Sequence, residues 1–202
     1  MNLHRNALAL ACTLLLAACL PVTSKTPVGS TTGLGADQAL YGTWKGYSDD
    51  HAVSYVHFIK KKDEGIAAIW VTPNNGDEDG GVGLFLVKTS KLGANSFIDI
   101  LKSYTVKEDA KNESDDTFLS GLNDSSIPML YRLGKNRTLT LYLLDEDKTK
   151  EAIQAGKLAG SVESGNFGDV KITADAAALD AFMATPEAVK LFKVFLVLKK
   201  AD

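Results

Sequence analysis

The sequence predicts a mainly β domain with short C-terminal helices, built as an antiparallel barrel or half-barrel. The first observation behind this prediction is a series of short apolar runs, rich in β-branched and aromatic residues, which turn residues separate from residue 40 onward. The second is alternation within a run: Leu139, Leu141 and Leu143 share one face of an extended chain, and the residues between them share the other. Short strands at this spacing favour an antiparallel sandwich or barrel over a parallel α/β sheet.

The expected strands follow one another closely along the chain. Each is an apolar and aromatic run that ends at a charged, glycine-rich or asparagine-rich turn. The turn over residues 134–137 joins the last two runs of the series as a hairpin. The runs span residues 41–47, 53–59, 65–71, 82–88, 96–101, 129–133 and 138–144.

The C-terminal part mixes helices with strands. Acidic residues at 145–147 and Gly156 bound a short predicted helix over residues 148–155, because acidic side chains favour helix starts and glycine favours helix ends. The remaining expected elements are a strand pair over 157–163 and 169–173, a helix over 176–184 capped by Thr173 or Asp175, a short helix from Pro186, and a final strand over 194–198.

Length and composition are those of one globular domain. The chain has 202 residues, of which 45% are hydrophobic and 23% are charged, and these proportions exclude wholesale disorder. A formal net charge of −3 argues against nucleic-acid binding, which depends on clustered Lys and Arg. Two cysteines cannot form a disulfide scaffold, and no cofactor is predicted.

The first residues have the features of a secretory signal. Arg5 precedes an apolar run over residues 7–18, which is too short to cross a bilayer as a helix. The sequence Leu16-Ala17-Ala18-Cys19 resembles the bacterial lipobox. This resemblance implies a signal peptide over residues 1–18 and lipidation of Cys19, and two or three acyl chains suffice for stable anchoring. The alternative is an ordinary signal peptide that is cleaved elsewhere.

The segment after Cys19 is expected to be a flexible tether. Residues 20–37 are rich in Pro, Gly, Ser and Thr and show no periodic apolar face. The predicted organisation is therefore a lipidated cysteine and tether over residues 19–37, followed by a single β-rich domain over residues 38–202. Leu20, rather than Asp, resembles the outer-membrane sorting pattern of Gram-negative lipoproteins. The expected location is the cell envelope, at the periplasmic face of the outer membrane if the source is Gram-negative.

The start of the first expected strand carries a family resemblance. Gly42-Thr43-Trp44 is similar to the G-x-W of lipocalin-like barrels, and the order of a strand meander, a helix and a final strand is similar too. The resemblance implies that Gly42 and Trp44 close the floor of a barrel. The chain departs from the family in two ways: it has no T-D-Y motif, and its final strand offers Lys199 and Lys200 instead of a late arginine. A filled barrel or half-barrel would give the same sequence signals.

Few residues indicate a catalytic, metal-binding or ligand-binding site. His51 and His57 follow the leader without an H-E-x-x-H pattern or a third histidine, so a zinc site has little support. The candidates for lining a ligand cavity are polar or aromatic side chains that could orient a ligand: Tyr47, Tyr55, His57 and Tyr142. The alternative for each is an ordinary role in the core or on a strand.

A weak calcium candidate lies in the turn over residues 74–81. Asn75, Asp77 and Asp79 have the spacing of the first half of a calcium loop, but the closing position is Leu86, which cannot coordinate. A solvated β-turn is therefore favoured, and no metal site is predicted.

The leading functional hypothesis is a non-enzymatic, lipid-anchored envelope domain that binds a small apolar ligand or an envelope protein. The membrane is its expected partner through Cys19, and nucleic acid is not. A periplasmic hydrolase or enzyme inhibitor is one alternative. A structural accessory of an envelope assembly is another.

Overall fold

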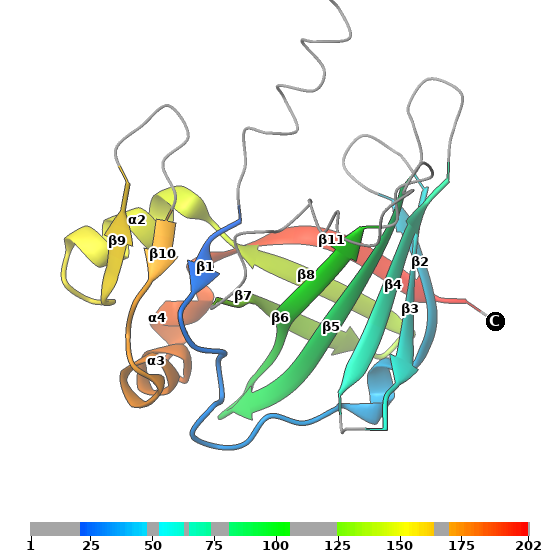
Figure 1. Cartoon of the computed structure of the whole chain (residues 1–202), viewed down its shortest axis with the longest axis horizontal. Helices are drawn as coiled ribbons and strands as arrows, with labels where there is room; N and C mark the ends of the chain where they lie inside the picture. Colours follow the sequence, from blue (N-terminus) through cyan, green and yellow to red (C-terminus); the bar gives the residue numbers. More distant parts are fainter. Residues whose placement is uncertain are drawn as a thin grey trace, which may run out of the picture.

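The structure is a computed structural model that describes residues 21–47, 53–62, 65–73, 81–105, 125–163 and 170–201. Its main feature is a closed antiparallel barrel of eight strands in the order β11-β2-β3-β4-β5-β6-β7-β8 (Figure 1). The strands are β2 (Gly42–Tyr47), β3 (Val53–Lys60), β4 (Ile66–Thr72), β5 (Gly81–Leu92), β6 (Asn95–Thr105), β7 (Ile127–Gly134), β8 (Thr138–Leu144) and β11 (Phe192–Lys200).

The predicted fold class is confirmed, and the barrel is closed rather than half-open. Strand β11 closes it by pairing with β2 on one side and β8 on the other. Strands β5 and β6 extend beyond the predicted runs and form one long hairpin, which turns at Gly93 with φ +57°. The sequence signal ended early because Lys88 to Ser90 break the apolar run, although Thr89 and Ser90 are buried.

The chain between β8 and β11, together with β1 near the start of the described chain, forms a smaller layer against one side of the barrel (Figure 1). A short sheet has the order β1-β10-β9. Asp145, Asp175 and Thr185 cap the three helices by accepting hydrogen bonds from the first-turn backbone. The elements are β1 (Thr23–Ser24), α2 (Glu146–Gln154), β9 (Gly160–Val162), β10 (Val170–Ile172), α3 (Ala176–Met183) and α4 (Pro186–Val189).

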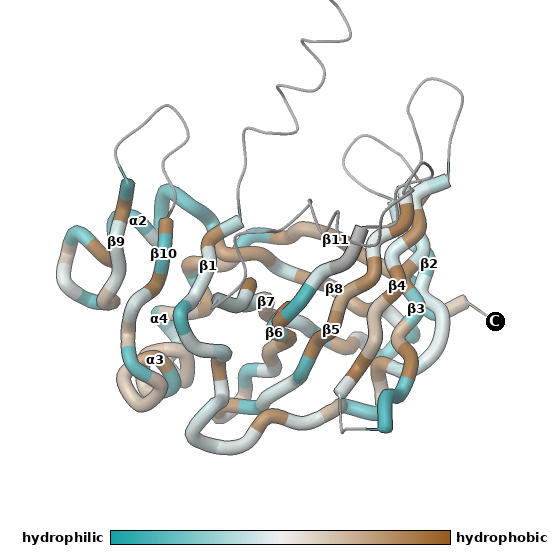
Figure 2. Tube along the Cα trace, viewed as in Figure 1, coloured by the Kyte–Doolittle hydropathy of each residue, from teal (hydrophilic) through white to brown (hydrophobic). Residues whose placement is uncertain are grey.

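Two apolar clusters hold these layers together. The first, the barrel core, lies inside the barrel and includes Leu40, Trp44, Phe58, Ile98, Met129 and Leu139. The second, the outer core, lies between the barrel and the smaller layer and includes Val22, Val28, Phe97, Leu130, Ile172 and Leu179. Figure 2 shows apolar residues alternating with polar ones along the barrel strands and recurring in the layer beside them.

The expectation of a flexible tether is wrong for residues 21–37. Val22 and Val28 are buried in the outer core, and β1 pairs in parallel with β10. Ser24 also exchanges two backbone hydrogen bonds with Ser126, which precedes β7. The composition of this segment hides these contacts, because two isolated buried valines make no periodic face. Cys19 and the boundary at residue 18 lie outside the described residues.

Candidate functional site

The barrel is closed at one end by residues just before and within β2. The 3-10 helix η1 (Gln38–Leu40) crosses this end, and the buried Trp44 indole N–H donates to the Leu40 carbonyl oxygen at 2.6 Å. Gly42 has φ +113°, a conformation that favours glycine, and a Cβ there would lie 3.2 Å from Lys200 Cε. Lys200 Nζ lies 5.2 Å from the Trp44 ring centroid. The final lysine thus occupies the face of the tryptophan as a cation–π partner.

A tyrosine inside the barrel reinforces this closed end. The Tyr131 hydroxyl donates to Asp37 Oδ2 at 2.6 Å, and the Asp37 N–H donates to Thr89 Oγ1 at 2.9 Å. Burial, together with the Asp37 carboxylate, raises the pKa of Tyr131 above its ordinary value. Because the tyrosine keeps its proton, it remains a donor to Asp37. This end of the barrel is therefore packed and hydrogen-bonded.

The side chains toward the other end of the interior are less buried. Partly buried apolar side chains border the barrel core there, among them Trp70, Phe85, Ile100 and Leu143. The Trp70 and Phe195 rings lie 5.6 Å apart, although two strands separate β4 from β11 in the sheet. These rings therefore meet across the interior, and Phe195 remains 38% exposed. The β-bulge between Val194 and Leu196 accounts for its inward position.

Glycines occupy inward-facing positions beside these rings. Gly83 pairs with Trp70 and Gly81 with Thr72 in the β4–β5 ladder. A Cβ at Gly81 would find no atom of the described residues within 4 Å, whereas one at Gly83 would lie 2.9 Å from the Phe85 ring. Lys193 of β11 is a charged residue at this end, because it pairs with the inward-facing Leu143, but its Nζ lies 3.7 Å from Asp145 Oδ2 and its side chain is 54% exposed. We call Trp70, Phe85, Ile100, Leu143 and Phe195 the apolar mouth.

The four predicted lining residues do not belong to this site, and that prediction was wrong. Trp44, Val56 and Phe58 face inward, so the alternate positions Tyr47, Tyr55 and His57 face outward. Tyr47 is 59% exposed, and His57 Nδ1 lies 2.9 Å from Thr43 Oγ1.

Tyr142 faces outward as well, on β8. Its pairing partner Leu130 belongs to the outer core, against which the Tyr142 ring is partly buried. All four residues were chosen for their hydroxyl or imidazole groups. The side of the strand on which each one lies was not considered. The buried Trp44 sets the phase of β2, and the pairing of β2 to β5 carries that phase to Trp70 and Phe85.

Two buried carboxylates hold the N-terminal segment and were not predicted. Asp180 of α3 accepts from the Gly29 and Thr31 backbone N–H groups at 2.6 and 2.9 Å, and also from the Thr31 hydroxyl. Asp99 of β6 accepts from the Val28 N–H at 3.0 Å through Oδ1. Both residues are buried, so each carboxylate supplies acceptors to backbone that would otherwise be unsatisfied.

Asp99 differs from Asp180 in its second oxygen. Asp99 Oδ2 is buried and has no hydrogen-bond partner among the described residues. Burial is the main reason that the pKa of Asp99 rises from 3.8 to about 8, with a smaller contribution from the charge of Asp180. The Val28 and Ser126 hydrogen bonds oppose this rise. The carboxyl is therefore mainly protonated at neutral pH.

The remaining sequence candidates fall outside the described residues. These are Cys19 and the calcium candidate Asn75, Asp77 and Asp79. Within the described residues no group of three or more His, Cys, Asp or Glu side chains could hold a metal ion. No helix in the same part of the chain is long and apolar enough to cross a membrane. No family of known proteins, curated protein or solved structure matches this chain.

Proposed function

We propose that this chain is a lipid-anchored cell-envelope lipoprotein whose lipocalin-like barrel binds a small apolar ligand. The observation that carries the proposal is the apolar mouth, whose aromatic side chains remain only partly buried at one end of the barrel. Partly exposed apolar groups that lie close together lose contact with water when an apolar ligand covers them. The lipobox sequence ending at Cys19 supports the anchor.

The side chains that occupy the interior limit the size of the ligand. Trp44, Phe58 and Leu139 are almost fully buried toward the closed end, so that half is occupied by the protein's own side chains. The mouth offers rings and aliphatic groups, and the charged residue beside it, Lys193, has Asp145 as its ion-pair partner. The fitting ligand is therefore the end of one apolar chain, with any charged headgroup left in water.

Gly81 provides the test, because it faces the mouth and leaves space for a side chain. Gly81→Leu should fill that space and weaken binding of a fluorescent fatty-acid analogue on the order of tenfold or more, measured by titration of the full chain. The matched control is Gly134→Leu. Gly134 is exposed on β7, beyond the inward-facing Tyr131, and a Cβ there would make only ordinary contacts with Thr138.

The control variant should bind the analogue as the unmodified chain does. Native mass spectrometry of the same samples checks whether the probe is retained at one copy per chain. Equal affinities of both variants would contradict binding at the mouth. Failure of the unmodified chain to bind any apolar probe would contradict the proposed function itself.

A further inference from the structure

The N-terminal segment crosses the outside of the β5–β6 hairpin, where polar groups hold it. The Val28 N–H donates to Asp99 Oδ1 of β6 at 3.0 Å, and the Val28 carbonyl oxygen accepts from Ser90 Oγ of β5 at 2.7 Å. The Val28 backbone therefore lies over the hairpin between these two side chains. Because Asp99 is fully buried, this part of the segment covers its carboxyl group.

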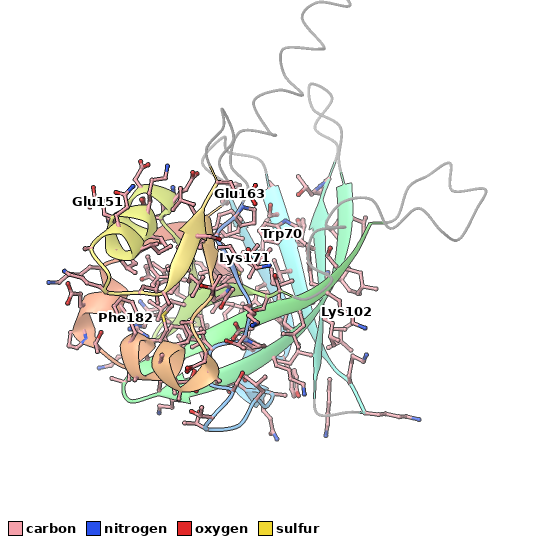
Figure 3. The ribbon with its side chains drawn as sticks, turned by 60° about the vertical axis from the view of Figure 1, so that its left-hand side comes forward. Trp70, Lys102, Glu151, Glu163, Lys171 and Phe182 are labelled. Atoms are coloured by element: carbon pink, nitrogen blue, oxygen red, sulfur yellow. The ribbon has the colours of Figure 1, made fainter. Side chains whose placement is uncertain are left out.

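Two carboxylates hold the middle of this segment. The N–H groups of residues 28, 29 and 31 donate to Asp99 or to Asp180. In the turned view of Figure 3, Lys171 marks β10 and Phe182 marks α3, the two elements of the smaller layer that contact the segment. The strand β1 pairs with β10, which is not a barrel strand. The segment could therefore detach without the loss of any strand from the barrel.

The two carboxylates differ in how well they tolerate a negative charge. Asp180 accepts three hydrogen bonds, spread over both of its oxygens, and these stabilise its ionised form. Asp99 Oδ2 has no partner among the described residues. Burial accordingly raises the pKa of Asp99 from 3.8 to about 8, and the charge of Asp180 adds to this rise. An ionised Asp99 would gain contact with water if the segment that covers it lifted away.

The charged groups around Asp99 do not replace that water. On β5, Lys88 lies opposite Asp99 in the ladder, but no hydrogen bond or ion pair joins the two within the described residues. The position opposite Asp99 on β7 is Pro128, which has no charge. On α3 the neighbouring charge is that of Asp180, which has the same sign. Within the segment itself, Lys25 is exposed to solvent.

We propose that residues 21–34 form a strap that stays docked while the Asp99 carboxyl is protonated and lifts from the β5–β6 hairpin as this carboxyl ionises. Gly35 is the fixed end of the strap, because it exchanges two backbone hydrogen bonds with Thr89 of β5. The strap precedes the barrel and follows Cys19, so its release lengthens the link between the proposed anchor and the barrel. Only this last consequence rests on the proposed function.

The direction of the effect follows from proton binding. With the strap docked, Asp99 keeps its proton up to about pH 8, and with the strap lifted it releases the proton near its ordinary pKa of 3.8. Between these values the docked form holds the extra proton. Opening therefore becomes more favourable as pH rises through this window, by about tenfold per pH unit at most, and is suppressed as pH falls.

Hydrogen exchange of the full chain measures this opening. The reporters are the N–H groups of Val28, Gly29 and Thr31, compared with those of β8 and β11 in the barrel. The strap reporters should be less protected than the barrel amides, and low urea concentrations should hardly change their exchange, because a local opening exposes little surface. Between about pH 5 and pH 7, their protection factors, corrected for the intrinsic exchange rate, should fall by up to about 100-fold.

A pair of variants assigns this dependence to one carboxyl group. Asp99→Asn has no proton to lose, so the protection of the strap reporters should stay constant over the same range. The matched control Asp147→Asn makes the same chemical change at an exposed position of α2 and should keep the fall. Loss of the fall in the control as well would mean that Asp99 is not its source.

Two further results would overturn the proposal. Strap reporters with the protection and urea dependence of the barrel amides would show that the strap opens only when the whole chain unfolds. Strap protection that is constant between these pH values in the unmodified chain, or that falls equally in Asp99→Asn, would show that the Asp99 proton does not hold the strap. The unmodified chain decides the first two cases even if Asp99→Asn folds poorly. Ligand binding enters none of these measurements, so their failure leaves the proposed function standing.

Discussion

The barrel core and the outer core use opposite faces of the same strands but are assembled differently. On β7, Met129 and Tyr131 face the barrel core, while Leu130 between them faces the outer core. Residues from the barrel strands and η1 supply most of the barrel core, whereas the outer core joins Val22 near one end of the chain to Phe192 near the other. Strand alternation therefore defines the first cluster, and only the docking of distant segments defines the second.

Truncation of Phe97, the largest fully buried side chain of the outer core, should cause the largest loss of stability among the tests of this comparison. Phe97 on β6 is fully buried, and its ring lies 6.1 Å from that of Phe192. Phe97→Ala should lower the free energy of unfolding by about 3–5 kcal/mol, measured by urea denaturation. Phe195→Ala, at the partly exposed mouth, should cost clearly less. A loss at Phe97 no larger than at Phe195 would show that the outer core is not part of the cooperative fold.

The strands could be predicted from the sequence, because their position follows from the alternation of apolar and polar residues. All eight barrel strands overlap the predicted runs, and Asp175 caps α3 as expected. The closure of the barrel could not be predicted, because a half-barrel has the same periodicity. Residues 21–37 were misread for a different reason. Their docking depends on hydrogen bonds to Asp99 and Asp180, which lie far along the chain and carry no local signal.

The candidate site was predicted less well than the fold. The residues chosen for lining, such as Tyr55 and His57, were selected by chemical type, and the structure places them on the outer face. The mouth residues Trp70 and Phe85 are aromatic too, but they lack the hydroxyl or imidazole groups by which the four candidates were chosen. Phe195 faces inward because of a β-bulge, and strict alternation does not predict that exception.

Two glycines of the docked N-terminal segment give the second prediction. Gly29 has φ +88°, and a Cβ there would lie 2.1 Å from Ser90 Cβ. Gly33 has φ +100°, but nothing lies within 4 Å of its would-be Cβ. Gly29→Ala should therefore cost about 2–4 kcal/mol from both strain and clash, whereas Gly33→Ala should cost about 1 kcal/mol from strain alone. Urea denaturation measures both.

Limited proteolysis measures local opening of the N-terminal segment in the same two glycine variants. Cleavage after Lys25 should accelerate in Gly29→Ala more than in Gly33→Ala, because only the first variant forces the segment away from Ser90. Equal cleavage rates in the two variants would contradict tight docking of this segment against the barrel.

The last prediction is a dependence of stability on pH, and its effect per pH unit is the smallest of the three. It originates at Asp99, where the N-terminal segment meets the barrel. The folded chain holds the Asp99 proton up to about pH 8, whereas the unfolded chain releases it near its ordinary pKa of 3.8. Between these values the folded state binds the extra proton, so stability falls as pH rises, by about 1.4 kcal/mol per pH unit at most. Asp99→Asn should remove this dependence, measured by urea denaturation across the window.

The comparison of slopes isolates Asp99 from other titrations. Asp145 has its pKa lowered, chiefly by the Lys148 backbone hydrogen bond, so its contribution is present at neutral pH and is lost as pH falls. That opposite trend is common to both proteins and cancels when their slopes are subtracted. Asparagine keeps an acceptor for Val28 and has no proton to lose. If Asp99→Asn kept the slope of the unmodified chain, Asp99 would not be the source of the pH dependence.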